Sequence, residues 1–260
     1  MRYKVLCGYI RQRWDCGDTV EIEEKHTGKY GARGQTREKK RKATPEEIKK
    51  HNQWKRERDV RRLIKWNFRE RDYWITLTYP KDYRPTWEEM KGHAGKLIRK
   101  MREKYKKQGW ILKYIYRLAI GSRGGRHIHI LVNRESNEKT ATDLIITDLW
   151  EQQWGHGHVN FRTTYDEGGY RKLAAYITKP LEEWESEELR RYHPSRNLIR
   201  KDPEVDEIKR RSLVDRDGVP RMPKAPKGYY VDPESIEVGI NPITHYAYRH
   251  YTLIKIKKRE

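Results

Sequence analysis

Cysteine and long apolar runs are nearly absent from this sequence. Cys7 and Cys16 are the only cysteines, too few for a disulfide framework or a four-cysteine zinc site, and they suit a reducing compartment. No run of about 18 apolar residues occurs, and the first residues lead into no apolar signal-peptide segment. These absences argue against a membrane span and predict a soluble, unsecreted, cytoplasmic protein.

Acidic residues and phenylalanine are also scarce. Lys and Arg total 59 against 38 Asp and Glu, a net charge of +21, and the aromatic residues are 9 Trp and 18 Tyr against 2 Phe. A basic excess attracts polyanions, because each Lys or Arg that neutralises a phosphate releases a condensed counterion. Trp and Tyr rings can also stack on unpaired bases. The composition therefore predicts a nucleic acid as the partner.

The N-terminal part of the chain is polar and basic. Residues 1–43 contain one strand-like run, from Tyr3 to Ile10, and then sequence with too little apolar surface to order itself. Thr44-Pro45-Glu46-Glu47 supplies an N-cap, a proline at the first helical position and a capping-box glutamate. We expect a mobile arm, followed by a long basic helix from Pro45 to about Phe68.

The C-terminal part alternates charge runs with Pro and Gly. Only one element is recognisable there, a strand from Tyr251 to Ile256. The predicted organisation is a basic N-terminal arm and helix, a core and a C-terminal extension, at residues 1–68, 69–182 and 183–260.

Strands and helices alternate in the predicted core. The expected elements are a strand at 73–79, a helix at 86–107, strands at 110–120 and 126–132, a helix at 140–154, a strand at 157–162 and a helix at 169–179. Up to residue 162 this order is the split βαβ pattern of ferredoxin-like sheets. We predict an α+β fold in which helices pack on a ferredoxin/RRM-like antiparallel sheet of about five strands.

Two histidines stand in one of these strands. Side chains alternate along a strand, so His127 and His129 share a face and can offer two imidazoles to one metal ion. Arg123 and Arg126, in and after the turn before them, are candidates for binding phosphates, since the guanidinium fork matches phosphate oxygens. The alternative is a pair of half-exposed histidines beside a basic, solvated turn.

The last predicted helix of the core carries a tyrosine between two lysines. Lys172 lies four residues before Tyr176 and Lys179 three residues after it, so the three share one helix face. Nearby positive charge favours the phenolate, which is the nucleophilic form of a tyrosine. The alternative is a half-buried aromatic residue with solvated lysines.

In this order, the motifs resemble those of the HUH endonucleases, and in particular the rolling-circle replication initiators of Gram-positive bacterial plasmids and phages. The matching motifs are Thr76-Leu77-Thr78-Tyr79, His127-Ile128-His129 and Tyr176-Ile177-Thr178-Lys179, and further likeness lies in 171–179 and 195–198. The likeness covers roughly residues 60 to 200.

The resemblance implies an enzyme that nicks and rejoins single-stranded DNA, built on an antiparallel sheet with helices on one side. His127 and His129 would hold Mg²⁺ or Mn²⁺, Tyr176 would form a 5′-phosphotyrosine and free a 3′-hydroxyl, and Lys179 would lie near the phosphate or the ion. The implied partners are origin DNA, for which a hairpin is one form, and a host helicase and polymerase in a bacterial cytoplasm. No G-x-x-x-x-G-K-S/T motif is present, so we expect no duplex unwinding by this chain.

One position departs from the family. Relatives commonly carry a glutamate ligand where this chain has Ala119, and two imidazoles alone make a poor Mg²⁺ site. Another side chain can reach the ion, water and the DNA phosphate can complete its shell, or the metal binds weakly. His156 and His158 are conceivable substitutes, although we expect them to be surface or structural residues.

Further alternatives concern the nucleophile and the class of protein. Tyr170 lies six residues before Tyr176, about 120° off its helix face, so one nucleophile is expected, with Tyr165 and Tyr170 structural or stacked on DNA. A single-tyrosine transposase or a relaxase would share the motifs. A degenerate relative would bind DNA without cleaving it. An RNA-binding ferredoxin-like module would stack bases on strand aromatics, but its sequence signature is not evident.

Overall fold

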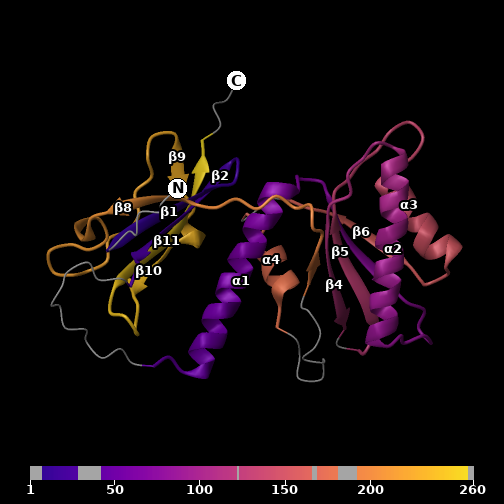
Figure 1. Cartoon of the computed structure of the whole chain (residues 1–260), viewed down its shortest axis with the longest axis horizontal. Helices are drawn as coiled ribbons and strands as arrows, with labels where there is room; N and C mark the ends of the chain where they lie inside the picture. Colours follow the sequence, from indigo (N-terminus) through magenta and orange to yellow (C-terminus); the bar gives the residue numbers. More distant parts are fainter. Residues whose placement is uncertain (1–7, 29–41, 122, 166–168, 181–191, 257–260) are drawn as a thin grey trace, which may run out of the picture. The chain divides into compact units, whose positions relative to one another are not determined.

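The computed structural model describes residues 8–28, 42–121, 123–165, 169–180 and 192–256 (Figure 1). The chain divides into two compact units, which we call the central unit, residues 53–199, and the terminal unit, residues 1–52 together with 200–260. Helix α1 (Pro45–Asn67) begins in the terminal unit and ends in the central unit. These boundaries differ from the predicted ones at 68 and 182, and the terminal unit joins both ends of the chain.

The central unit contains a five-stranded antiparallel sheet in the order β6-β3-β5-β4-β7. Its strands are β3 (Tyr73–Thr78), β4 (Tyr114–Ile120), β5 (Arg126–Val132), β6 (Val159–Thr163) and β7 (His193–Pro194). Its other helices are α2 (Trp87–Lys107), α3 (Thr142–Thr147), which continues into the π-helical turn η1 (Asp148–Gln153), and α4 (Arg171–Thr178). The α+β prediction with an antiparallel sheet and packed helices is confirmed.

Each face of this sheet is covered by helices, which corrects the expectation of helices on one side. Ile75, Leu77 and Ile130 are fully buried on one face, in a core shared with α2, α3 and η1. On the opposite face, Ile115 and Leu131 pack with residues of α1 and α4. Figure 1 shows α2 and α3 on one side of the sheet and α4 on the other. The second face attracts helices because its strands carry apolar side chains at one end.

Both predicted capping boxes are present. The Thr86 hydroxyl accepts a hydrogen bond from the Glu89 amide, while the Glu89 carboxylate accepts one from the Thr86 amide at 2.7 Å. Thr44 and Glu47 make the same reciprocal pair at the start of α1. These bonds satisfy amide donors that a helix start otherwise leaves unpaired. No helix of the described residues is both long and apolar enough to cross a membrane.

The terminal unit holds a six-stranded antiparallel sheet, in the order β10-β11-β2-β1-β8, with β9 also paired to β11. Its strands are β1 (Tyr9–Asp15), β2 (Thr19–His26), β8 (Glu204–Ile208), β9 (Tyr229–Val231), β10 (Glu237–Ile240) and β11 (Ala247–Lys255), with short 3₁₀ turns η2 (Arg210–Ser212) and η3 (Pro233–Ser235). The expectation of a mobile arm is therefore wrong for residues 8–28, which form a hairpin. The basic run at 29–41 and residues 1–7 lie outside the described residues.

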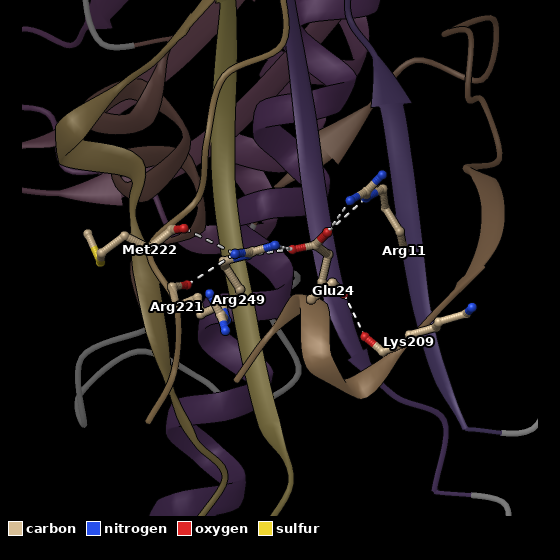
Figure 2. A network of polar contacts seen from close by, with 7 residues as sticks. Arg11, Glu24, Lys209, Arg221, Met222 and Arg249 are labelled. Carbon is tan, nitrogen blue, oxygen red and sulfur yellow. Dashed lines mark hydrogen bonds and ion pairs between the residues drawn. The ribbon is translucent and has the colours of Figure 1, made fainter. Parts of the chain in front are cut away.

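A buried charge network crosses the middle of this second sheet (Figure 2). The Glu24 carboxylate is fully buried, and it accepts hydrogen bonds from Nε of Arg11 at 2.7 Å and from Nε of Arg249 at 2.5 Å. Arg249 also donates from Nη1 to the carbonyl oxygens of Arg221 and Met222. Three strands and one loop are thereby tied to a single carboxylate.

Candidate active site

The register of β3, β4 and β5 gathers the polar residues at one end of the central sheet. His129 lies directly opposite Thr76 of β3 and Arg117 of β4. His127 lies opposite Thr78 and Ala119 in the same way. Residues directly opposite each other in antiparallel strands project to the same face, so these side chains share one surface. The two imidazole rings are 4.6 Å apart between centroids.

Each histidine has one ring nitrogen held by a neighbouring group. Nδ1 of His127 lies 3.1 Å from the Gly125 carbonyl oxygen, and because a carbonyl only accepts, Nδ1 carries the proton and Nε2 keeps its lone pair. Nδ1 of His129 lies 3.1 Å from the Thr76 hydroxyl. Such contacts fix the tautomer of metal-binding histidines. With the proton on Nδ1, both rings present Nε2 as a ligand.

Helix α4 brings Tyr176 onto this histidine pair. The phenol oxygen of Tyr176 is 2.5 Å from Nε2 of His129, and the two rings meet edge to face. Trp74 of β3 stacks on His129 with the ring planes 7° apart and contacts the Tyr176 ring edge-on. The Tyr176 side chain nevertheless keeps 41% of its surface exposed, so the nucleophile candidate is reachable from solvent.

Burial sets the protonation of these groups. It lowers the pKa of His129 to about 3, helped by the positive charge that His127 and Arg117 bring nearby, and it also lowers the pKa of His127. Both imidazoles are therefore neutral at pH 7, the form that binds metal. Burial also raises the pKa of Tyr176, and the opposing charges of Arg117 and Lys179 only reduce this rise. The expectation that flanking lysines favour the phenolate is thus wrong for the free protein.

The remaining predicted site residues lie around this cluster in different ways. Lys172 on α4 and Lys179 at its C-terminal end are exposed, and Arg123 is exposed in the β4–β5 turn. Arg126 alternates with His127 along β5, and its guanidinium lies 5.3 Å from the ring centroid of Trp87 at the start of α2. The structure therefore places Arg126 at the same end of the sheet as the histidines but toward the opposite face.

No third metal ligand is found next to the histidines. Ala119 stands opposite His127, where the relatives' carboxylate was expected, and the described residues contain no group of three His, Cys, Asp or Glu side chains able to hold a metal. His156 packs against His93 elsewhere, with ring centroids 4.3 Å apart, and the side chain of His158 is 93% exposed. Neither replaces the missing ligand among the described residues.

Sequence analysis missed Arg117, a residue of this site. It interrupts the apolar run of β4 as a single charge between Tyr116 and Leu118, and such a position is normally buried on both faces or paired. That interruption is the sequence signal. Tyr170, by contrast, is buried at the start of α4 with φ of 60°, so it is a structural residue, as one of the two predictions had it.

Comparison with known proteins agrees with the site's location. A helix-borne tyrosine over a strand-borne histidine pair defines a candidate phosphoryl-transfer centre on an α+β sheet. Residues 72–181, from β3 to the end of α4, match the family model of the replication-associated protein ORF2, a rolling-circle replication initiator family. No curated protein and no solved structure matches the chain. The predicted resemblance to rolling-circle initiators is confirmed for this segment.

Proposed function

We propose that this replication initiator nicks and rejoins single-stranded origin DNA through a covalent link to Tyr176. The observation that carries the proposal is the 2.5 Å contact between the Tyr176 phenol and Nε2 of His129, next to His127. A nucleophile and a pair of metal-ligating nitrogens thus meet at one solvent-accessible end of the sheet, within the segment that matches the initiator family.

Mg²⁺ or Mn²⁺ fits this site with two protein ligands, Nε2 of His127 and Nε2 of His129. Their Nδ1 atoms are already held by Gly125 and Thr76, which supports this assignment. Oxygen ligands are what these ions prefer, and water and the DNA phosphate are the expected sources, since β3, β4 and β5 contain no Asp or Glu. A bound ion would supply positive charge that stabilises the transition state at the scissile phosphate.

The chemical step transfers a phosphoryl group to the tyrosine. The Tyr176 oxygen attacks the phosphorus, the bond to the 3′-oxygen breaks, and the products are a 5′-phosphotyrosine and a 3′-hydroxyl. The phenolic proton leaves to solvent, and the 3′-oxygen takes up a proton in exchange. Arg117 and Lys179 assist because their charges favour the phenolate. The free 3′-hydroxyl is a primer for a host polymerase, and a host helicase would open the duplex.

The exposed cations around the site suit the DNA backbone. Lys172 and Lys179 of the α4 region and Arg123 in the β4–β5 turn can reach phosphates on either side of the scissile one. Arg126, stacked near Trp87, would contact the strand only beyond the edge of the sheet. This arrangement favours unpaired DNA, whose backbone can follow a curved path between these elements.

The test uses overlapping single-stranded oligonucleotides that cover the DNA around the gene of this protein. With Mn²⁺, the wild-type protein should form an adduct that survives SDS, and Tyr176→Phe should form none. The control is Tyr170→Phe, which should form the adduct at the wild-type rate. An adduct with Tyr176→Phe at the wild-type level would contradict the assignment of the nucleophile.

A second candidate function is DNA binding without cleavage. The observation that favours it is Ala119, which leaves the histidine pair without the expected carboxylate. The same oligonucleotides distinguish the two functions: retention of the DNA with equal absence of product, both without metal and with Mn²⁺, would identify a binder.

A further inference from the structure

The C-terminal end of α4 is held by side chains from other elements. The carbonyl oxygens of Tyr176, Ile177 and Lys179 each accept a hydrogen bond from Nη1 of Arg117, at 3.2, 3.2 and 2.7 Å. The carbonyl of the remaining residue, Thr178, accepts one from Nε2 of Gln53 at 3.0 Å. A helix end leaves such carbonyls without partners inside the helix. Here four consecutive ones are bonded by an arginine of β4 and a glutamine of α1.

Arg117 is placed to do this by the sheet itself. It lies in the middle of β4, is 5% exposed, and stands directly opposite His129 in the β4–β5 register. Helix α4 has no basic residue in its own last turn, where positive charge is favourable. The same side chain therefore shares a sheet position with a metal-ligand candidate and bonds the helix that carries the nucleophile candidate.

We propose that Arg117 is a positioning residue that fixes the end of α4, and with it Tyr176, over the histidine pair. The inference rests on the proposed phosphotyrosine chemistry. All three bonds go to backbone oxygens, so they hold the main chain at Tyr176 and leave the phenol free to turn from Nε2 of His129 to a phosphate. The planar guanidinium suits several carbonyls at once, whereas a lysine is a flexible point charge.

Loss of this contact should lower the rate of the chemical step more than DNA binding. Displacement of a catalytic group by about 1 Å can lower a rate about 100-fold. We therefore expect Arg117→Met to form the adduct about 100-fold more slowly at saturating DNA, with a half-saturating DNA concentration within about threefold of the wild type. Arg117→Lys keeps the charge and should fall between Arg117→Met and the wild type.

The measurement is the single-turnover rate of adduct formation as a function of DNA concentration, with Mn²⁺ and the full chain. Arg62→Met is the matched control, because Arg62 is a second buried arginine of the central unit, 4% exposed, that makes none of the α4 bonds described. It should keep the wild-type rate. If Arg117→Met does not fold, Arg117→Lys carries the test.

The outcomes separate the two levels of the proposal. Absence of an adduct with the wild-type protein would refute the phosphotyrosine chemistry itself. An adduct with the wild type, together with an equal saturating rate for folded Arg117→Met or Arg117→Lys, would refute the role of Arg117 alone. A fall confined to the half-saturating DNA concentration would instead assign Arg117 to DNA binding and would also overturn the inference.

Discussion

Strand β2 of the terminal unit and strand β5 of the central unit both lie inside antiparallel sheets, and both carry several polar side chains. Those of β2 include three glutamates, Glu21, Glu23 and Glu24, all buried. Those of β5 include His127 and His129, and neither β5 nor its neighbours β3 and β4 contain a carboxylate. One sheet buries acidic groups, while the other presents neutral imidazoles.

The two buried arginines show what this difference means. Arg249 in the terminal unit bonds the Glu24 carboxylate and two loop carbonyls, so its contacts tie strands and a loop together. Arg117 in the central unit bonds the carbonyls of α4 and stands opposite His129. In the first sheet the ionic contacts hold the fold. In the second, a similar buried cation lies beside groups that can bind a metal and a phosphate.

The sharpest test of this contrast is removal of the carboxylate in the terminal sheet. Glu24→Ala leaves Arg249 buried without its anionic partner, and breaking a buried pair of this kind typically costs about 3 to 5 kcal/mol. Because Arg11 keeps 38% of its side chain exposed, we expect the lower end, about 3 kcal/mol in urea denaturation. Glu204→Ala, in an exposed pair with Arg13, should cost at most about 1 kcal/mol. Similar losses for both variants would refute the contrast.

The central sheet should show its neutral imidazoles as a dependence of stability on pH. The pKa of His129 is lowered from 6.5 to about 3, so between these values the unfolded chain binds a proton that the folded protein does not. Stability therefore falls as the pH drops below 6.5, by about 2 kcal/mol at pH 5. His129→Gln should remove about this much of the loss between pH 7 and pH 5 in urea denaturation. His158→Gln, at a 93% exposed side chain, should not, and equal pH profiles for wild type and His129→Gln would contradict the burial of a neutral ring.

Supplying the carboxylate that the central sheet lacks should convert it into a better metal site. Ala119→Glu places an oxygen ligand opposite His127, and we expect Mn²⁺ to bind about tenfold more tightly in isothermal titration. Ala119→Gln is the matched control, since it has nearly the same size and no charge. Equal affinities for the two variants would show that this position does not face the ion.

The smallest expected effect concerns the contact between Tyr176 and His129. Because the phenol occupies the nitrogen that a metal requires, Tyr176→Phe should bind Mn²⁺ about 2- to 10-fold more tightly than the wild type, corresponding to the net worth of one hydrogen bond. Tyr170→Phe should leave the affinity unchanged. Weaker binding by Tyr176→Phe would indicate that the phenol is itself a ligand.

Periodicity predicted the central unit because its signals are local. The predicted helix from Pro45 to about Phe68 is α1, and the predicted strand at 73–79 is β3, since caps and alternation lie within each element. The terminal sheet could not be predicted in this way. β2 is buried only through pairing with β11, more than 200 residues later, and its own glutamates suggest exposure. Arg117 was missed for the same reason, because its partners are backbone oxygens of a distant helix.

The pairing of β2 with β11 also orders the events of synthesis. The central unit, residues 53–199, leaves the ribosome as one continuous segment and can fold when its last strand appears. The hairpin of β1 and β2 emerges first, yet β2 has an unpaired edge until β11 is made. A nascent chain thus completes its histidine and tyrosine site before it completes its terminal sheet, and a chain that stops short of residue 247 presents an open strand edge for aggregation.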